Sequence, residues 1–352
     1  MILEPFKINK ITLSNRIVVA PMCQYSAING CPSQWHYGHF QQLSNSGAGS
    51  LFFESTAINM MGRITLNDLV LNNIKQEIEF TRIVNYIRKI CEIKIGIQIS
   101  HAGRKGSSEL PWIKLNHPIK NRFSWKTVSA SSLKRDKIWP TPKQLSIEDI
   151  YKIINDFKNS ALRAKKIGFD CLEIHMAHGY LLHQFFSPIS NKRKDEFGGS
   201  FENRCKLLLE TARNIRNIWP KEKILGARIT GSDYLLNGIE IEDSIKLVKK
   251  LKDIGIDYVC VSSGGIKPIT KLSFKPGYQV YLAEQIKKKT GIITRTAGMI
   301  TNLKQAEYIV KNRKADLIAI GREFIKNPTW LIKEMKKLKK IVIPNQYKRC
   351  FD

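Results

Sequence analysis

The sequence predicts a single-domain α/β fold, a (β/α)8 TIM barrel in which eight parallel strands alternate with helices. Short β-branched, apolar runs alternate with longer segments whose apolar residues recur at helical spacing. Eight such units fit into 352 residues, an ordinary size for this barrel. A doubly wound sheet would instead place G-x-G-x-x-G after its first strand, where this chain has Pro21-Met-Cys-Gln-Tyr25.

The eight apolar runs are nearly continuous, which indicates strands that are buried on both faces, as in a parallel sheet. We expect strands at residues 16–20, 50–53, 94–99, 170–174, 224–229, 257–261, 292–296 and 316–320. The helical segments between them include residues 77–90, 147–167, 202–219, 241–254, 279–289 and 303–312. In a TIM barrel the residues that follow the strands line the active-site face, so these positions predict where a site lies.

Two regions depart from the alternation. Residues 101–146 form a long connection after the third strand, with Trp125 and Trp139 within it. Connections of this length in a compact domain are usually functional, so we expect an excursion over the active-site face. Residues 344–352 form a tail beyond the last barrel helix. No linker or repeat divides the chain, and a single domain is expected over residues 1–352.

The chain is strongly basic, with 58 Lys and Arg against 30 Asp and Glu and a formal net charge of +28. Such an excess can indicate nucleic-acid binding, because clustered cations release phosphate counterions. Here the lysines are spread along the whole chain, with one dense tract at residues 333–340. Ile and Asn are also frequent, a combination typical of AT-biased codon usage. We therefore expect no nucleic-acid partner, although the surface should attract anions.

The sequence indicates neither a membrane protein nor a disulfide or metal protein. No run approaches the roughly 20 uninterrupted apolar residues of a membrane helix, and the first residues lack the regions of a signal peptide. The seven cysteines never show C-x-x-C spacing: Cys23, Cys31, Cys91, Cys171, Cys205, Cys260 and Cys350. We expect a cytoplasmic protein without bound metal.

The pair His175-x-x-His178 follows the fourth predicted strand, and three interpretations of it are open. Histidines are common zinc ligands, but Glu173 and Asp170 lie inside or before the strand, so a third ligand is not evident. The two rings could instead be core side chains bonded to backbone. In the third interpretation they donate hydrogen bonds to a substrate oxygen on which negative charge develops. Tyr180 would then be a proton donor, which favours protonation of a carbon next to a carbonyl.

A second group of residues predicts an anion site. Gly298 follows the seventh strand and Gly321-Arg322 follows the eighth, where TIM barrels commonly bind phosphate, although both could be ordinary turn glycines. Arg228 at a strand end needs either a structural ion pair or an anionic ligand. Gln98 can donate and accept, which suits the pyrimidine edge of a flavin ring. Flavin mononucleotide (FMN) has the length to span these positions.

Several sequence motifs, spread over nearly the whole chain, resemble those of a single protein family. They include Ala20-Pro-Met-Cys-Gln-Tyr25, Ile97-Gln-Ile-Ser-His-Ala-Gly-Arg-Lys105, Glu173-Ile-His-Met-Ala-His-Gly-Tyr-Leu181, Phe197-Gly-Gly-Ser-x-Glu-Asn-Arg204, Ser262-Ser-Gly264 and Ile320-Gly-Arg322. Together they resemble the Old Yellow Enzyme family of FMN-dependent ene-reductases, and specifically its thermophilic-like bacterial class. The histidine block and the Phe197–Arg204 run are specific to this family.

The resemblance implies an enzyme of the NADPH dehydrogenase or ene-reductase type, with tightly bound, non-covalent FMN and with NADPH or NADH as reductant. FMN would be bound by Ala20, Pro21, Met22, Cys23, Ser55, Gln98, Arg228, Gly298, Gly321 and Arg322. Cys23 would lie beside the flavin ring, as is characteristic of this class. Ser55 stands where the class more often has Ala.

The resemblance also implies roles around the substrate. His175 and His178 would hold the carbonyl oxygen of the acceptor, Tyr180 would protonate its α carbon after hydride arrives from flavin N5, and Tyr25 would line the pocket. Acceptors would be electrophilic alkenes such as enones, enals and maleimides, reduced by ping-pong kinetics, with quinones and nitro compounds as further candidates.

The same resemblance implies a homodimer or homotetramer in which Arg349 of a neighbouring subunit reaches the substrate site. Two alternatives from other classes are an FMN-binding sensor without turnover and a basic nucleic-acid-binding protein. The intact set of His175, His178 and Tyr180 argues against the sensor.

Overall fold

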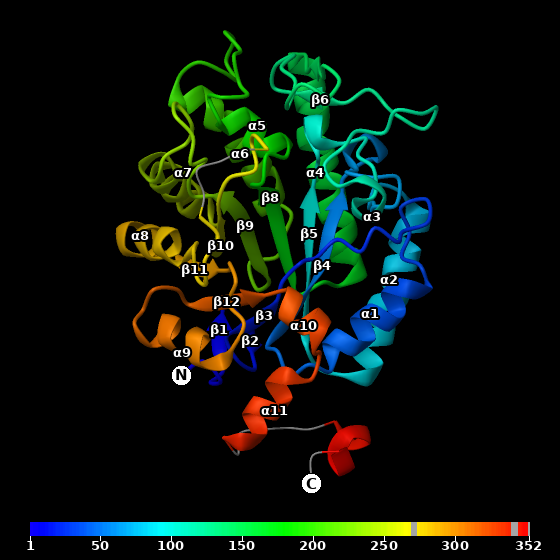
Figure 1. The fold of residues 1–352 in the computed structure, drawn as a ribbon, viewed down its shortest axis with the longest axis vertical. Coiled ribbons are helices and arrows are strands. Elements are labelled where there is room, and N and C mark those ends of the chain that lie inside the picture. The colour runs from blue at the N-terminus through cyan, green and yellow to red at the C-terminus, as the bar shows by residue number, and fades with distance from the viewer. Residues whose placement is uncertain (269–272, 339–343, 351–352) are drawn as a thin grey trace.

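A closed barrel of eight parallel strands organises the computed structural model, which describes residues 1–268, 273–338 and 344–350 (Figure 1). Around the barrel the strands are β10 (Tyr258–Ser262), β11 (Ile293–Thr296), β12 (Leu317–Ile320), β3 (Ile17–Val19), β4 (Ser50–Ala57), β5 (Lys94–Ser100), β8 (Cys171–Met176) and β9 (Ile224–Thr230). All paired neighbours are parallel. The predicted TIM barrel is confirmed, and each predicted apolar run overlaps a barrel strand.

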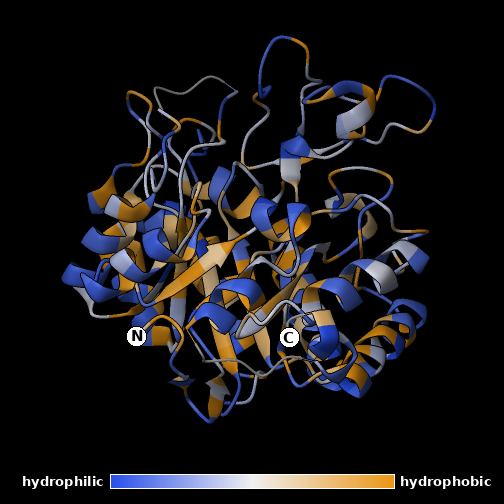
Figure 2. Cartoon of the chain, turned by 60° about the horizontal axis from the view of Figure 1, so that its bottom comes forward, coloured by the Kyte–Doolittle hydropathy of each residue, from blue (hydrophilic) through white to orange (hydrophobic). Residues whose placement is uncertain are grey.

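Helices surround the barrel, and Figure 2 shows hydrophobic residues gathered along the strands and hydrophilic residues on the outer helix faces. The longer helices are α1 (Gln34–Ser44), α2 (Ile74–Ile90), α4 (Ile147–Ile167), α6 (Phe201–Arg216), α7 (Ile241–Ile254), α8 (Val280–Thr290), α9 (Leu303–Lys311) and α11 (Trp330–Lys337). Short helices are α3 (Pro111–Lys114), α5 (Leu181–Phe186) and α10 (Arg322–Lys326), with 3-10 turns η1 (Met60–Gly62), η2 (Gly103–Lys105) and η3 (Asn345–Cys350). All six predicted helical segments form, with ends shifted by a few residues.

Two differences from the prediction have local causes. Helix α2 begins three residues earlier than expected because Asn73 caps it, accepting from the backbone N–H of Gln76 at 3.0 Å. Helix α1 is not predicted, since its buried face mixes His36 and Ser44 with Phe40 and Leu43 and therefore shows no clear apolar period.

The interior of the barrel is filled from its N-terminal end by an apolar plug. A hairpin of β1 (Phe6–Ile8) and β2 (Ile11–Leu13) contributes Ile8 and Leu13 to a cluster with Val18, Phe52, Cys171, Ile224, Tyr258, Cys260 and Leu317. These strand residues alternate with those that pack outward on the helices, such as Ile17 and Val19. The plug leaves the C-terminal end of the barrel as the open end, where polar side chains gather.

The long connection at residues 101–146 has structure of its own. It contains η2 and α3, and its short strands β6 (Val128–Ser129) and β7 (Lys143–Gln144) pair with each other. In Figure 1 α3 and β6 lie on the same side as the arrowheads of β4 and β5. Because the arrowheads mark the C-terminal strand ends, the connection covers the face on which the site was expected.

The C-terminal segment lies away from that face. Figure 1 shows η3 beyond α11, at the lower end of the view. Of the predicted tail, residues 351–352 lie outside the described residues, as do residues 339–340 of the lysine tract.

Within the described ranges no helix is long and apolar enough to cross a membrane. The same part of the chain holds no group of three or more His, Cys, Asp and Glu side chains placed to bind a metal ion.

Candidate active site

A cavity of about 670 Å³ lies over the C-terminal ends of the strands. Its wall is built from Arg228 of β9 and from the C-terminal ends of β3, β8, β10, β11 and β12 with the segments that follow them, together with Lys105 and Arg135 of the long connection. The sequence-predicted residues that line it are Ala20, Pro21, Met22, His178, Arg228, Gly298, Gly321 and Arg322. A cavity of this size is typical of a small-molecule or cofactor site.

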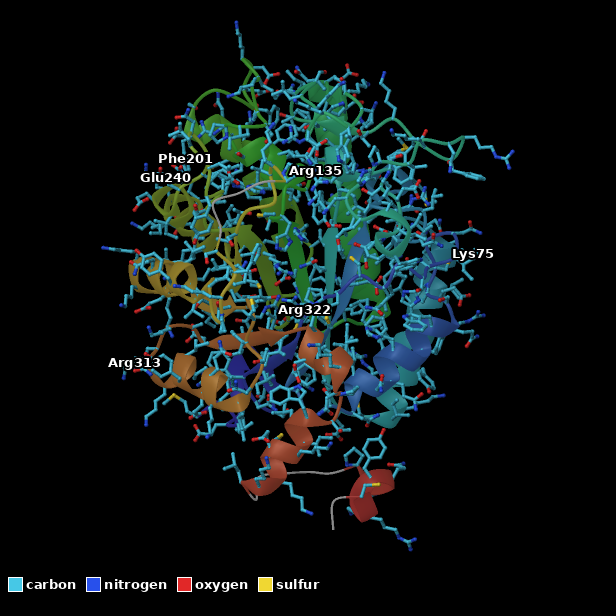
Figure 3. The ribbon with its side chains drawn as sticks, viewed as in Figure 1. Lys75, Arg135, Phe201, Glu240, Arg313 and Arg322 are labelled. Carbon is cyan, nitrogen blue, oxygen red and sulfur yellow. The ribbon has the colours of Figure 1, made fainter. Side chains whose placement is uncertain are left out.

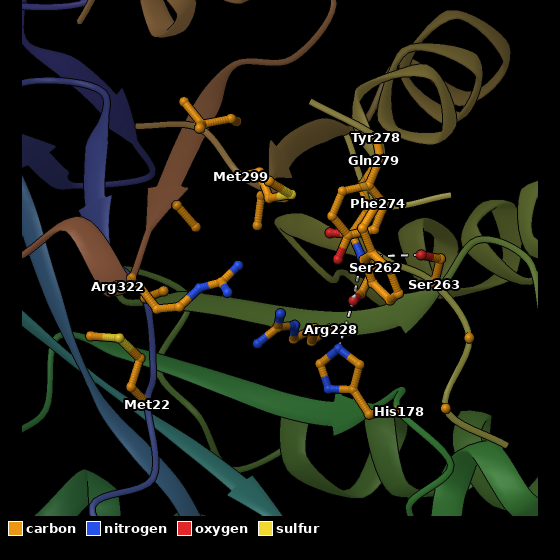
Figure 4. Close-up of a pocket in the computed structure, with 18 of the residues that line it drawn as sticks. Met22, His178, Arg228, Ser262, Ser263, Phe274, Tyr278, Gln279, Met299 and Arg322 are labelled. Carbon is orange, nitrogen blue, oxygen red and sulfur yellow. Dashed lines mark hydrogen bonds between the residues drawn. The ribbon is translucent and has the colours of Figure 1, made fainter. Parts of the chain in front are cut away.

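Two guanidinium groups face the same part of the cavity. Figure 4 shows Arg228, from β9, and Arg322, at the start of α10, pointing toward one another. Neither forms an ion pair with any described residue, and the buried Nε of Arg228 has no hydrogen-bond partner. Arg228 is half-buried and Arg322 is exposed. Because two facing cations repel one another and neither is neutralised by a described carboxylate, this part of the cavity favours an anionic ligand.

The glycines of this end allow close packing around the same space. Gly298 has φ of +108°, and a Cβ there would lie 2.9 Å from the Tyr278 ring. A Cβ on Gly321 would lie 2.9 Å from Sδ of Met22. Position 298 therefore requires glycine, whereas a Cβ at position 321 would have to displace the flexible Met22 side chain, and both glycines keep the backbone close to the cavity beside Arg322.

The two predicted histidines contact each other directly. His175 Nε2 lies 3.1 Å from His178 Nδ1, and the backbone N–H of Ala177 donates to His175 Nδ1 at 3.2 Å. Burial lowers the pKa of both rings well below the ordinary value, and the nearby charge of Arg228 lowers both further, so both are neutral. A backbone N–H can only donate, so His175 carries its proton on Nε2 and donates it to His178.

The chain of hydrogen bonds continues to β10. His178 accepts at Nδ1, so its own proton is on Nε2, 2.6 Å from Ser262 Oγ. Gln279 Nε2 donates to Ser262 Oγ and to Ser263 Oγ, both at 3.1 Å (Figure 4). Ser262 thus receives two hydrogen bonds. In this structure both ring protons of the histidines are engaged within the protein.

The backbone around His178 is held by a close approach of two loops. His178 has φ of +57° and Gly179 has φ of +72°. A Cβ on Gly179 would overlap the carbonyl oxygen of Gly265. The site is further fixed by His183, whose Nδ1 accepts from the Gly179 N–H at 2.7 Å and whose Nε2 lies 3.0 Å from an oxygen of Asp233.

Tyr180 lies beside the histidine pair at the start of α5. Its ring centroid is 4.7 Å from that of His175 and 6.4 Å from that of His178. Burial, followed by the nearby Cys23, raises the pKa of the Tyr180 phenol far above its ordinary value. The hydroxyl is therefore protonated at neutral pH and can serve only as a proton donor until it has given up its proton.

The segment after β3 carries Cys23 and Tyr25. The Cys23 sulfur interacts with the backbone N–H of Ser55 and with the Tyr25 hydroxyl, and burial, followed by the charge of Glu54, raises the pKa of its thiol. Ser55 Oγ is hydrogen-bonded to Ser100 Oγ, and Tyr25 packs edge-on against Trp112 of α3 at 6.2 Å between centroids. The long connection thus contacts this segment directly.

The remaining predicted residues lie in other environments. Gln98 is inside the barrel, where its Nε2 donates to Glu173 at 2.7 Å, and Glu173 is paired with the buried Arg295. Arg349 is exposed on η3. Within the part of the chain that the structure describes, the cavity wall does not include His175, Tyr180, Cys23, Tyr25, Ser55, Gln98 or Arg349.

The sequence predicts no role for Lys105 or Arg135, yet both line the cavity. Lys105 Nζ donates to the carbonyl oxygen of His178 at 2.8 Å and lies 5.0 Å from the Tyr180 ring centroid. Its place in the His-Ala-Gly-Arg-Lys105 run after the third strand was a usable signal. For Arg135, in the middle of the long connection, the sequence offers no comparable signal.

The comparison with known proteins agrees with this architecture. The family model described as NADH:flavin oxidoreductase / NADH oxidase family matches residues 1–340. An NADPH dehydrogenase of Clostridium acetobutylicum is 40% identical over 100% of this chain and 99% of its own. An NADPH dehydrogenase of Listeria innocua is 38% identical, with 98% of both chains covered.

Solved structures show the same fold at lower identity. Morphinone reductase superposes with a TM-score of 0.78 at 23% identity, covering 97% of this chain and 90% of that one. A 2-naphthoyl-CoA reductase superposes with a TM-score of 0.86 at 22% identity, and this chain spans about half (53%) of its length.

A TIM barrel whose full-length relatives are NADPH dehydrogenases is an oxidoreductase. The chain belongs to the NADH:flavin oxidoreductase / NADH oxidase family, the Old Yellow Enzymes, as its motifs indicated.

Proposed function

We propose that this protein is an FMN-dependent NAD(P)H oxidoreductase that reduces the C=C bond of activated alkenes such as enones, enals and maleimides. In the overall reaction NAD(P)H is oxidised to NAD(P)⁺, and the alkene gains a hydride at its β carbon and a proton at its α carbon. The proposal rests on one observation: a cavity lined by arginines that form no ion pair with a described residue lies beside two neutral histidines and a protonated tyrosine.

The residues present fit FMN. Arg322 and Arg228 face one space without an ion pair among the described residues, and the buried Nε of Arg228 lacks a partner. Glycines at 298 and 321 leave room that a Cβ would fill. We assign Arg322 with the two glycines to the phosphate and Arg228 to the electron-rich edge of the ring. When bound, FMN supplies the two-electron carrier between NAD(P)H and the acceptor.

The neighbouring residues supply the rest of the FMN site in this proposal. Ala20, Pro21 and Met22 form the wall of the cavity after β3. We assign Cys23 and Ser55, which lie next to one another beyond this wall, to the rest of the FMN site. Gln98 uses one of its two Nε2 hydrogens on Glu173, which leaves the other hydrogen and the carbonyl oxygen for a ligand.

The histidine pair serves the acceptor. The neutral rings of His175 and His178 carry one proton each, now engaged with His178 and Ser262 respectively. A carbonyl oxygen that replaces either partner receives a hydrogen bond without the cost of moving a charged ring. Such donors stabilise negative charge on that oxygen as the bond is reduced.

Tyr180 delivers the proton. Its raised pKa keeps the phenol protonated, and its ring packs against that of His175, which supports assigning the proton transfer to it. Transfer of this proton to the α carbon leaves a phenolate that is reprotonated from solvent. A positioned general acid of this kind typically contributes about 10²–10⁴-fold in rate.

Assembly completes the proposal. The relatives that match over their full lengths are called NADPH dehydrogenases, which supports NADPH as the reductant. Arg349 is exposed on η3, so we propose that it enters the substrate site of a neighbouring subunit in a homodimer or homotetramer. Light scattering of the wild-type protein and an Arg349→Ala variant would test this assignment separately from the chemistry.

The first experiment is the visible spectrum of the purified protein under anaerobic conditions. We expect flavin absorption that bleaches on addition of NADPH and returns on addition of cyclohex-2-enone. Bleaching without recovery on any activated alkene would contradict the proposed acceptor. A colourless protein that takes up no added FMN would contradict the cofactor and the proposed function with it.

A further inference from the structure

Three cationic side chains gather where the long connection covers the cavity: Arg104, Lys105 and Arg135. Arg104 and Arg135 are 2% and 5% exposed, and Lys105 is half-buried. Lys105 and Arg135 line the cavity together with His178. Within residues 1–268, 273–338 and 344–350, none of the three cations forms an ion pair with a carboxylate.

Their hydrogen bonds go to neutral groups. Arg104 joins two loops, because its Nη1 donates to the carbonyl of Leu133 at 3.1 Å and its Nη2 donates to that of Ile266 at 3.0 Å. Arg135 donates through Nη2 to Asn116 Oδ1 at 3.3 Å, and its guanidinium lies 5.0 Å from the Trp139 ring centroid.

Lys105 and Arg135, the two cations that line the cavity, each have N–H groups that form no hydrogen bond with a described residue. Arg135 donates to Asn116 through Nη2, which leaves its Nη1 donors uncommitted among the described residues, whereas its unpartnered Nε is enclosed. Lys105 Nζ has three N–H donors, and the His178 carbonyl uses one of them. An incoming carboxylate can therefore be met by both side chains without breaking the bonds that hold them.

The local charge is not balanced by the acids nearby. Asp136, next to Arg135, accepts from the Ile138 N–H at 2.9 Å and attracts Arg135 and Arg104 only at longer range. Asp233, which also attracts Arg104, is paired with His183. Burial and the charges of Arg135 and Arg104 lower the pKa of Lys105 to about 7. Clustered buried cations of this kind are stabilised by any anion that enters.

This cluster is separate from Arg322, which is assigned to the FMN phosphate. Figure 3 shows Arg135 in the upper part of the molecule and Arg322 near its centre. His178 contacts Lys105 through its carbonyl oxygen. The cavity therefore has a second cationic group away from Arg322, next to the segment that carries the proposed hydrogen-bond donors to the acceptor.

We propose that Lys105 and Arg135 form a carboxylate subsite, so that the preferred acceptor is a compact activated alkene that carries a carboxylate close to the reacting double bond. The inference rests on the proposed function and adds a substrate class to it. The anion must lie close to the reacting bond because Lys105 Nζ is 5.0 Å from the ring centroid of Tyr180, the proposed proton donor.

A second source of anion is the reductant. The phosphates of a nicotinamide dinucleotide are separated from the nicotinamide ring by a ribose, whereas Lys105 contacts the segment that carries His178 and Tyr180. We therefore assign the subsite to the acceptor, and the experiment includes an arm for the dinucleotide.

The test uses the holoenzyme and two matched acceptors, 4-oxocyclohex-2-ene-1-carboxylate and its methyl ester. In these compounds the carboxylate is not conjugated with the alkene, so the charge is the main difference. We expect wild-type kcat/KM to favour the anion by at least about tenfold, the effect of one charge-assisted hydrogen bond. The preference should fall by about tenfold in Arg135→Met, and Arg135→Lys should retain part of it.

A matched control removes a charge from the same connection. Lys134 is exposed and does not line the cavity, within the residues that the structure describes. Lys134→Met should leave the preference for the anion unchanged. Loss of the preference in Lys134→Met as large as in Arg135→Met would show a long-range effect of net charge and would overturn the subsite.

Calorimetry gives a readout that needs no turnover. The saturated ketone 4-oxocyclohexane-1-carboxylate cannot be reduced at C=C, and we expect it to bind wild type about tenfold more tightly than its methyl ester. Equal binding of acid and ester by wild type, together with equal kcat/KM values for the two alkenes, would overturn the inference and leave the proposed function intact.

To test whether the cations bind the dinucleotide, the KM for NADPH is measured in the same variants. An increase of about tenfold in Arg135→Met without any change in the preference for the anionic acceptor would assign the cations to the reductant and overturn the inference. Failure of the wild type to reduce either alkene, with tight binding of the saturated acid retained, would contradict the proposed function but not the carboxylate subsite.

Discussion

The Nε2 atom of His175 lies 3.1 Å from Nδ1 of His178, and the backbone N–H of Ala177 fixes which of the two rings donates. The two rings therefore act as one unit whose protons run toward Ser262. A ligand oxygen has to replace one of these partners. Its affinity then depends on the difference between two neutral hydrogen bonds, which is small, and not on the desolvation of a charge.

The first prediction concerns Tyr180. Tyr180→Phe removes the proton donor and should slow reduction of the acceptor by about 10²–10⁴-fold. Reduction of the bound flavin by NADPH needs no proton from this residue and should change by less than about threefold. Stopped-flow measurement of the two half-reactions separates the effects. An equal loss in both half-reactions would contradict the assigned role.

The second prediction concerns Arg322 and the phosphate. Arg322→Met should weaken binding of FMN by about tenfold or more, because a charge-assisted hydrogen bond to phosphate is lost. Binding of riboflavin, which lacks the phosphate, should change little. Fluorescence titration of the apoprotein with both flavins measures the ratio, and the exposed Lys311→Met is the charge-matched control. Equal weakening for both flavins would show that Arg322 does not meet the phosphate.

The third prediction concerns pH and Lys105. Its folded-state pKa of about 7 lies below the ordinary 10.5, so the unfolded chain holds this proton more tightly between these pH values. The contribution of Lys105 to the free energy of unfolding therefore rises with pH across this window, by at most about 1.4 kcal/mol per pH unit. Below about pH 7 both states hold the proton and the contribution is constant.

Lys105→Met removes this dependence. We expect the stability of the variant, relative to wild type, to fall as the pH rises from about 7 toward about 10, measured by urea unfolding. Arg104, Arg135 and Tyr180 face the same ammonium group and remain in both proteins. A constant difference between the two proteins over this range would contradict the lowered pKa.

The fourth prediction compares two glycines. Gly179→Ala places a Cβ on the carbonyl of Gly265 at a residue with φ of +72°, and should destabilise the protein by about 2 kcal/mol or more while displacing His178. Gly38→Ala lies in α1 with nothing near its Cβ and should stabilise by about 0.5–1 kcal/mol. Thermal unfolding of both variants measures the contrast. A neutral Gly179→Ala would show that the two loops separate easily.

Much of the barrel is predictable because its strands are buried on both faces and read as apolar runs, such as residues 94–99 in β5. The prediction of strand ends fails where the buried positions of a strand hold polar residues. Strand β4 continues through Glu54, Ser55 and Thr56, which are 1%, 6% and 0% exposed, and the predicted strand stops at Phe53. These polar side chains find partners only in the folded barrel, as Ser55 does with Ser100.

The site residues also fall into those that the sequence predicts and those that it does not. The sequence by itself determined the barrel, the family, and the side chains that follow individual strands, because strand periodicity fixes which residues reach the C-terminal edge. Only the tertiary structure decided that Arg135, which follows no barrel strand, lies with Lys105 on the cavity wall beside His178. The physical reason is that the long connection has no apolar period of its own, so its course is set by packing such as Trp112 on Tyr25 and Arg104 on two carbonyls.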